Sequence, residues 1–310
     1  MILVVIPSLA LAAVTMAAFF GRWVWWLDVL ANFRAQYVVA LALLGLIVAV
    51  SRWRKTGYAI LAAALVNLVV VLPLYVGSPA EERIEADTIR LMSFNLLSTN
   101  QNYSDVIEYV RTVDPDLVLL HESSRPWEVA IESADLGYDI RRTSDDLIFG
   151  TLVLVRGKDI TVVSHGYALS APRAVTVEFT PEEWDNAVKV LSSHPVAPTD
   201  EERAGLRDAQ IGFAADWAAS QEGAFIVVGD FNATPWSWPF RHLMDSADLR
   251  NSQRGFGLQP SFPVTSNLLL RVPIDHLLHS PDLETTARQL GPNLGSDHFP
   301  LVVDLQLASS

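Results

Sequence analysis

The first 80 residues contain three long apolar stretches, Ile2–Phe20, Ala35–Val50 and Tyr58–Val76. A helix needs about 20 mainly apolar residues to cross the hydrocarbon core of a bilayer. The middle stretch reaches that length only if it includes Val29–Phe33. We therefore expect three transmembrane helices within residues 1–77, in preference to buried helices of a soluble core. A cleaved signal peptide is disfavoured because no Lys or Arg precedes the first stretch.

The loop between the second and third stretches contains a cluster of basic residues, Arg52, Arg54 and Lys55. Short basic loops stay in the cytoplasm, so the N-terminus is also expected there and the chain leaves the third helix on the outer side. This topology predicts a multi-pass protein of the cell membrane. Residues 78–87, which are rich in acidic residues, are expected to form a solvated linker to an extracytoplasmic domain at residues 88–310.

The charge of that domain limits its partners. Residues 1–80 hold five of the 22 basic and one of the 35 acidic residues, which leaves a formal net charge of −17 on residues 81–310. Proteins that hold long nucleic acids normally present a surplus of basic residues to the phosphates. Nucleic acid is therefore disfavoured as a partner. The absence of cysteine excludes a thiolate nucleophile and a cysteine-based zinc site.

From residue 88 onward, short apolar runs alternate with helical patterns. Strands are expected at Ile89–Leu96, Leu117–His121, Ile148–Val155, Ile160–Val163, Ala174–Phe179, Ala187–Ser192, Ala224–Val228, Ile274–Leu278 and Leu301–Leu305. Helices are expected at Ser104–Val113, Pro126–Ser133, Asp200–Ala219 and Trp238–Asp245. This pattern predicts a layered α/β or α+β domain with mixed sheets.

The helix expected at Asp200–Ala219 has the clearest start. Thr199 and Glu202 have the spacing of a capping box, in which the two side chains satisfy free backbone N–H groups. On the same helix, Arg207 and Gln210 could reach a cleft, but a solvated helix face is favoured for both.

Polar residues interrupt the apolar runs at the ends of several expected strands, where a rigid sheet can direct them into one cleft. In chain order the segments are RLMSFNLL with Asn95, DLVLLHES with Glu122, LSSHPVAP with His194, VVGDFNATPWS with Asp230 and Asn232, and the pair PIDHLL and GSDHFP with Asp275, Asp297 and His298. Carboxylate and amide oxygens suit Mg²⁺ or Mn²⁺. Carboxylates and imidazoles beside such an ion are the groups that phosphoryl transfer to water requires.

The ordered set of segments resembles the endonuclease/exonuclease/phosphatase (DNase-I-like) superfamily, over about Ile89 to Leu305. The resemblance implies an α/β fold, a four-layer sandwich of two mixed sheets flanked by helices. It also implies a metal-dependent phosphoester hydrolase with Mg²⁺ or Mn²⁺ as cofactor. With the N-terminal stretches, the expected architecture is this sandwich preceded by three transmembrane helices.

The resemblance also implies roles for individual residues. Glu122, Asn95 and Asp297 match the positions that bind the metal. Asp230 matches the aspartate that activates water, and Asn232 the asparagine that binds the phosphate. His298 matches the histidine that contacts the phosphoryl oxygens, Asp275 matches the aspartate that orients that imidazole, and His194 matches a proton donor to the leaving group.

Other histidines are interpreted differently. His121 should point to the sheet face opposite Glu122, because successive strand residues alternate between faces. It is therefore expected to be structural, and His276 and His279 are expected to take no part in the reaction.

Three functions remain to be distinguished. The first is a membrane-anchored phosphodiesterase or phosphatase whose partners are the lipid bilayer and a phosphoester substrate, such as a lipid-linked phosphate outside the cytoplasm. The second is an extracytoplasmic nuclease. The third is a catalytically silent, membrane-bound binding module, in which the metal-binding residues would have no purpose.

Overall fold

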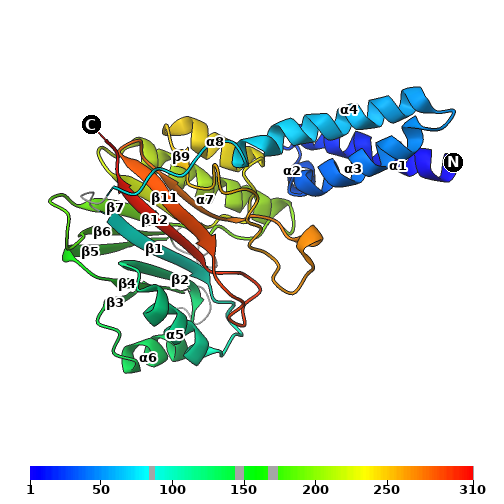
Figure 1. Ribbon diagram of the computed structural model, residues 1–310. Coiled ribbons are helices and arrows are strands. Elements are labelled where there is room, and N and C mark those ends of the chain that lie inside the picture. Colours follow the sequence, from blue (N-terminus) through cyan, green and yellow to red (C-terminus); the bar gives the residue numbers. More distant parts are fainter. Residues whose placement is uncertain (84–87, 144–149, 167–173, 310) are drawn as a thin grey trace.

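An N-terminal bundle of helices projects from a layered α/β domain in the computed structural model (Figure 1). The structure describes residues 1–83, 88–143, 150–166 and 174–309. The bundle contains α1 (Ile2–Ala17), α2 (Trp25–Ala31), α3 (Arg34–Ala49) and α4 (Arg54–Val71).

Two helical segments of the bundle are long and apolar enough to cross a membrane by themselves, Ile2–Phe20 and Arg54–Leu74. The middle stretch differs from the prediction of a third separate span. Helices α2 and α3 meet at an angle of 67°, so Val29–Phe33 does not extend α3 in a straight line. The bundle therefore has two candidate spans, or three if the bent pair counts as one.

The ends of the bundle differ in character. Helices α3 and α4 pack side by side, and the basic loop that joins them lies at the end far from the α/β domain (Figure 1). Helix α2 lies at the opposite end, against α7 (Glu201–Ala219) of the domain. The basic loop and the domain are thus on opposite sides of the apolar helices.

The domain is built on two six-stranded mixed sheets with the strand orders β11-β12-β1-β2-β4-β3 and β5-β6-β7-β8-β10-β9. The strands of the first sheet are β1 (Thr88–Asn95), β2 (Leu117–Ser123), β3 (Asp139–Arg142), β4 (Gly150–Val155), β11 (Leu283–Leu290) and β12 (Leu301–Leu307). Those of the second are β5 (Lys158–His165), β6 (Ala174–Thr180), β7 (Val188–Ser192), β8 (Phe225–Asp230), β9 (Arg250–Asn251) and β10 (Asp275–His279). In each sheet one pair is parallel, β1 with β2 and β7 with β8.

Apolar side chains fill three interfaces between four layers. Residues such as Leu119 and Val228 pack between the two sheets. Helices α5 (Tyr103–Val113) and α6 (Arg125–Ser133) cover the outer face of the first sheet through residues such as Val110 and Ile131. Helices α7 and α8 (Trp238–Ser246) cover the second. The four-layer α/β sandwich expected from the sequence is confirmed.

All nine expected strands are present, although residues 148–149 of one of them lie outside the described residues. Three further strands, β3, β9 and β11, were not expected. Two of them, β3 and β9, are short, and all three lie at the edges of the sheets. Edge strands have one unpaired side and need no continuous apolar run, so hydrophobicity alone does not reveal them.

Helix α7 departs from the sequence prediction at its start and on its buried face. Its N-cap is Asp200, whose side chain accepts a hydrogen bond from the backbone N–H of Arg203 at 2.9 Å, and the cap at Thr199 is wrong by one residue. The solvated face is also wrong, because Arg207 and Gln210 are each 1% exposed. Arg207 forms an ion pair with Asp28 of α2 at 2.9 Å.

The bundle is attached to the domain by several hydrogen bonds. The other carboxylate oxygen of Asp28 accepts from the backbone N–H of Trp238 at 2.7 Å. Asn32 accepts from the Thr234 hydroxyl at 3.0 Å, and the Gln36 amide donates to the carbonyl of Arg271 at 2.8 Å. These bonds fix the bundle to three different loops or helix ends of the domain.

The linker is not free in solvent over its described part, residues 78–83. The backbone N–H of Ala80 donates to the carbonyl of Thr285 on β11 at 2.9 Å. Gln306 on β12 donates to the carbonyl of Glu81 at 3.0 Å and accepts from the backbone N–H of Arg83 at 3.2 Å. The expected linker is exposed at Ser78, Pro79, Glu81 and Glu82, as a solvated segment should be, but it is also hydrogen-bonded to the first sheet. Residues 84–87 lie outside the described residues.

Candidate active site

A cavity of about 190 Å³ lies at the end of the sandwich where β1, β2 and β8 finish. Its lining consists of Asn95, Glu122, His194, Val196, Ala197, Arg203, Asp230, Asn232, Phe262, Asp297 and His298. Seven of the eight residues predicted from the sequence are in this lining. The eighth, Asp275, is buried behind the cavity and accepts a hydrogen bond from His298.

Asn95 connects the two sheets at the floor of this cavity. Alternation along β1 places Leu91 between the sheets and therefore directs Asn95 to the same side. Its amide nitrogen lies 3.2 Å from Glu122 Oε1 and 3.1 Å from Asp230 Oδ2, so it donates to carboxylates on both sheets. Its oxygen accepts from the backbone N–H of Leu97 at 3.0 Å, which fixes the orientation of the amide.

Glu122 reaches the cavity through an irregularity in its strand. The register of β2 against β4 shifts between Leu120 and Ser123, and Glu122 has a left-handed φ of 55°. A bulge of this kind redirects a side chain, and a non-glycine residue at positive φ is strained unless its surroundings hold it there. The backbone N–H of Ser98 donates to Glu122 Oε2 at 3.0 Å and holds the carboxylate toward Asn95.

Asp230 and Asp275 lie directly opposite each other on the antiparallel strands β8 and β10. The imidazole of His298 lies between them, with Nδ1 2.8 Å from Asp275 Oδ2 and Nε2 3.6 Å from Asp230 Oδ2. The hydroxyl of Ser296 accepts from the backbone N–H of His298 at 3.0 Å and donates to the carbonyl of Asn95 at 2.7 Å. The imidazole is thus held by both sheets.

The electrostatics of this group favour a protonated imidazole. Burial opposes a charge on His298, but the carboxylates of Asp275 and Asp230 outweigh it and raise the pKa of His298 to about 10. Burial also raises the pKa of Asp230, and the nearby His298 and His194 only partly offset this. The pKa of Asp275 is lowered, because the charge and hydrogen bond of His298 outweigh the effect of burial.

Asn232 and His194 also line the cavity, beside Asp230. The backbone N–H of Asn232 donates to Asp230 Oδ1 at 2.9 Å, and its φ of 47° is left-handed. Its amide nitrogen donates to the carbonyl of Pro195 at 2.9 Å and so holds the loop that contains His194. His194 Nε2 lies 3.5 Å from Asp230 Oδ2 and 3.8 Å from Glu122 Oε1.

Three other histidines, His121, His276 and His279, are buried but do not line the cavity. His121 points between the sheets, where it lies 2.8 Å from the Ser192 hydroxyl and its ring centroid is 5.5 Å from that of His194. The expected opposite orientation of His121 and Glu122 is wrong, because the bulge in β2 turns Glu122 to this side as well. His276 lies 2.9 Å from the carbonyl of Ala233. Burial lowers the pKa of both His121 and His276 to about 3, so both are neutral near pH 7.

Two sets of side chains could hold a metal ion. Ligand atoms of Asp230, Asp275 and His298 lie within 4.8 Å of one another. However, a protonated imidazole has no lone pair to offer a metal, and Nδ1 of His298 is already hydrogen-bonded to Asp275. This first set is therefore the less suitable one. Glu122, Asn95 and Asp297 line the open cavity instead, and the oxygen ligands that two carboxylates and an amide can offer suit Mg²⁺ or Mn²⁺.

Two lining residues were missed by sequence reasoning. Arg203 is the only Arg or Lys among the described residues that line the cavity, and its Nε donates to the carbonyl of Ala197 at 3.0 Å. Phe262 packs on His298, with 4.7 Å between the ring centroids. Neither occurs at the end of an apolar run. The spacing of Arg203 three residues after the cap Asp200 would have placed it on the first turn of α7 but not in the cavity.

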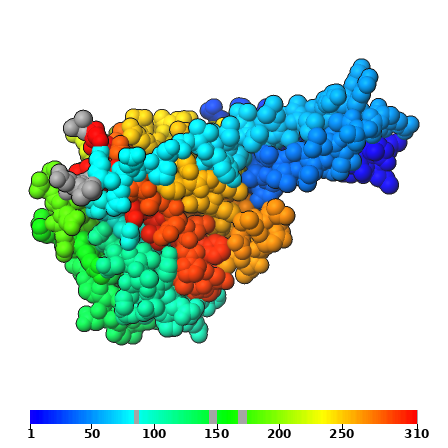
Figure 2. Space-filling model, in the orientation of Figure 1, coloured from blue at the N-terminus to red at the C-terminus, as the bar shows by residue number. Residues whose placement is uncertain are grey.

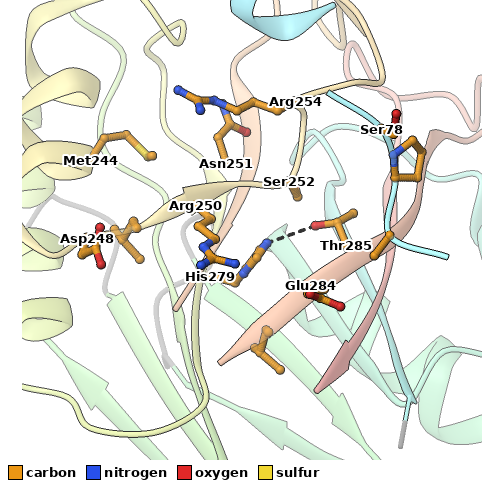
Figure 3. A pocket seen from close by; sticks show the side chains of 14 residues that line it. Ser78, Met244, Asp248, Arg250, Asn251, Ser252, Arg254, His279, Glu284 and Thr285 are labelled. Atoms are coloured by element: carbon orange, nitrogen blue, oxygen red, sulfur yellow. Dashed lines mark hydrogen bonds between the residues drawn. The ribbon is translucent and has the colours of Figure 1, made fainter. Parts of the chain in front are cut away.

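A second cavity, of about 540 Å³ (Figure 3), shares no lining residue with this site. Its lining includes Ser78, Asp248, Arg250, His279 and Thr285, and none of the eight predicted residues. His279 Nε2 lies 3.1 Å from the Thr285 hydroxyl across this cavity. The second cavity, although larger than the first, therefore contains none of the predicted site residues.

Comparison with known proteins identifies the fold and the family. The domain is similar to D. rerio TDP2 complexed with a single-strand DNA product (13% identity, TM-score 0.59, 71% of this chain and 99% of that chain). It is also similar to an endonuclease/exonuclease/phosphatase from Beutenbergia cavernae (18%, 0.56, 72% and 72%) and to the human Nocturnin catalytic domain with bound sulfate (20%, 0.52, 74% and 100%). Curated proteins give no significant match. The Endonuclease/Exonuclease/phosphatase family profile matches residues 92–298, so the chain belongs to this family, whose members are generally metal-using phosphoester hydrolases.

Proposed function

We propose that this chain is a membrane-anchored, divalent-metal-dependent phosphoester hydrolase that acts on a lipid-linked phosphate outside the cytoplasm. Residues 1–77 form the anchor, 78–87 the linker and 88–310 the catalytic domain. The observation that supports this most directly is the attachment of the anchor to the walls of the cavity. Arg207, which forms the ion pair with Asp28, lies one helical turn after the lining residue Arg203. Thr234, which donates a hydrogen bond to Asn32, lies two residues after the lining residue Asn232.

The cavity has suitable residues for a metal. Glu122, Asn95 and Asp297 would hold Mg²⁺ or Mn²⁺, and the carboxylate of Glu122 is already fixed by the backbone N–H group of Ser98. A bound divalent ion would neutralise charge on the phosphate. Arg203 adds a positive charge to a cavity that otherwise contains three carboxylates, those of Glu122, Asp230 and Asp297.

The remaining residues supply proton transfer and positioning. Asp230 accepts a proton from the attacking water and orients it, since burial raises the proton affinity of this carboxylate. The His298 imidazolium donates a hydrogen bond to a phosphoryl oxygen, and Asp275 orients its ring. Asn232 binds the phosphate. His194, whose Nε2 lies 3.5 Å from Asp230 Oδ2, donates a proton to the leaving oxygen.

Two alternatives are less well supported. The solved TDP2 structure contains a DNA product, so DNA is a reasonable competing substrate. The net charge of −17 on residues 81–310 opposes the binding of a long nucleic acid. A silent binding module would not require strained backbone at Glu122 and Asn232, which both line the cavity.

The test is hydrolysis by the full chain, purified in detergent, in the presence of Mg²⁺ or Mn²⁺. The substrates are an isoprenoid pyrophosphate, phospholipids, a bis-aryl phosphodiester and DNA. Asp230→Asn and His298→Ala should abolish turnover of the lipid substrates. Asp248→Asn, in the second cavity, is the matched control and should leave turnover unchanged. Turnover of DNA alone would support the nuclease instead, and no turnover of any phosphoester would support the binding module.

A further inference from the structure

An apolar groove of about 750 Å³ lies where the anchor meets the catalytic domain. Helices α3 and α4 form one side, and a segment that follows the strand β9 forms the other. The lining residues are Ala35, Gln36, Val38, Val39, Ala40, Leu43, Leu68, Val71, Leu72, Tyr75, Leu258, Leu268 and Leu269. Gln36 is the only amide among them, and its nitrogen is bonded to the carbonyl of Arg271. The groove is therefore suited to a hydrocarbon and offers little to a polar ligand.

The domain side of the groove is a closed loop. Phe262 and Val272 form an antiparallel bridge with backbone N···O distances of 3.1 and 2.6 Å. The bridge joins the two ends of the loop formed by residues 262–272. Inside the loop, the Arg271 guanidinium donates to the carbonyls of Ser266 and Val264 at 3.0 and 2.9 Å. These bonds hold the loop in one conformation.

The same loop lines both the groove and the catalytic cavity. At its base, Phe262 packs on the ring of His298, and the backbone N–H of Val264 donates to the carbonyl of Asp297 at 2.8 Å. At its tip, Leu268 and Leu269 line the groove. A molecule with a phosphate at the base and a chain along the tip would contact both ends of the loop.

The tip is unusually apolar for the surface of a domain. Leu268, Leu269 and Leu270 are consecutive and are 65%, 68% and 56% exposed. Figure 2 shows the orange atoms of this region projecting from the domain on the side of the blue anchor. The anchor residues across the groove, including Val39, Leu43 and Leu72, are also exposed. Exposed apolar patches of this kind mark contact with a membrane or an apolar ligand.

We propose that this groove holds a hydrocarbon chain of the substrate while the phosphate of the same molecule occupies the catalytic cavity. This inference rests on the proposed function and specifies its substrate class: a phosphoester with a long alkyl or isoprenoid chain that enters from the outer leaflet. The groove is continuous with the surface that α3 and α4 present to the bilayer, so the chain remains in an apolar environment along its path. A second protein is not required to cover the leucines.

The experiment compares two substrates that differ only in chain length, hexadecyl and methyl p-nitrophenyl phosphate, with the full chain in detergent. Leu268→Gln combined with Leu269→Gln should raise KM for the hexadecyl ester about tenfold and leave kcat/KM for the methyl ester unchanged. Leu270→Gln is the matched control, because Leu270 belongs to the same exposed tip but does not line the groove. Equal effects of the double variant on both esters, or an equal effect of Leu270→Gln, would overturn the inference.

A binding measurement separates this inference from the proposed function. Hexadecyl phosphate with a photoactivatable diazirine at the end of its chain should label peptides from 35–43 and 258–269 in the full chain. Labelling confined to other segments would overturn the groove assignment even if hydrolysis is observed. Labelling of the groove without hydrolysis of either ester would retain the groove and contradict the proposed function.

Discussion

Arg207 on α7 and Asp28 on α2 form an ion pair in which the nitrogen and oxygen are 2.9 Å apart and the two side chains are 1% and 2% exposed. The pair joins the anchor to the helix whose first turn contributes Arg203 to the candidate active site. Loss of Asp28 would leave the buried Arg207 with only the partly exposed Asp208 as a carboxylate partner. The anchor and the catalytic domain should therefore unfold together.

Asp28→Asn should lower the stability of the full chain by about 3 kcal/mol, because it removes the buried carboxylate that compensates the charge of the buried Arg207. Asp208→Asn removes the second carboxylate that contacts Arg207, at 2.8 Å, and is the matched control. Since the Asp208 side chain is 36% exposed, its removal should cost less than about 1 kcal/mol. Thermal unfolding in detergent measures both, and equal losses would contradict the special role of the buried pair.

Chelation with EDTA should abolish hydrolysis, and Mg²⁺ or Mn²⁺ should restore it. Glu122→Gln should increase the Mg²⁺ concentration needed for half-maximal activity by about tenfold or more, because it removes a carboxylate that lines the cavity. The measurement is the rate as a function of metal concentration. Glu284→Gln, which changes a carboxylate of the second cavity, is the control and should show the same dependence of rate on metal concentration as the wild type.

Asp275→Asn should lower kcat about 100-fold or more, because the imidazole of His298 loses its orienting partner. The pH dependence gives a more specific result. Asp275 helps to raise the pKa of His298 to about 10. In the proposed mechanism the protonated form of His298 is the active one, so activity should be lost as the pH rises through that pKa. Removal of the carboxylate should move this alkaline limb of the pH–rate profile to lower pH. An unchanged limb would show that another group titrates there.

His279 should make the protein less stable in acid. Burial lowers the pKa of His279 to about 4, below its ordinary value of 6.5. Between these values the unfolded chain binds a proton that the folded chain does not, so stability falls as the pH falls from about 6.5 toward 4. The contribution is at most about 1.4 kcal/mol per pH unit. Thermal unfolding of His279→Gln should show a weaker pH dependence than the wild type, whereas the exposed His242→Asn should not.

The proposed topology is testable because the chain contains no cysteine. Glu222→Cys lies on the surface of the domain, and Ser51→Cys lies beside the basic loop without changing its charge. A membrane-impermeant thiol reagent should label the first variant on intact cells and the second only after permeabilisation. The reverse pattern would place the catalytic domain in the cytoplasm.

The central strands and the residues at their ends could be predicted from the sequence. Apolar runs such as Leu117–His121 form strands because they are buried on both faces, and polar residues at their ends gather at one end of the sandwich. The position of Asp275 behind His298 followed from the family resemblance alone.

Other features depend on contacts that no local pattern encodes. Arg207 is buried because Asp28, 179 residues earlier in the chain, lies against it. Glu122 faces the cavity because of a bulge and a left-handed φ, whereas simple alternation with His121 does not reveal which of the two points there. The bend between α2 and α3 likewise follows from the packing of α2 on α7, and the edge strands from pairing with their neighbours.

The hydrogen bonds of Asp28, Asn32 and Gln36 to the domain fix the catalytic cavity at one height relative to the apolar helices. An enzyme held in this way does not sample the surrounding solution on a flexible tether. With the apolar helices in a membrane, as proposed, it would meet a lipid substrate by lateral diffusion in two dimensions, so its turnover should follow the number of substrate molecules per unit area of membrane. Dilution of the lipid substrate with inert lipid should slow the reaction, while dilution of the whole vesicle suspension should not.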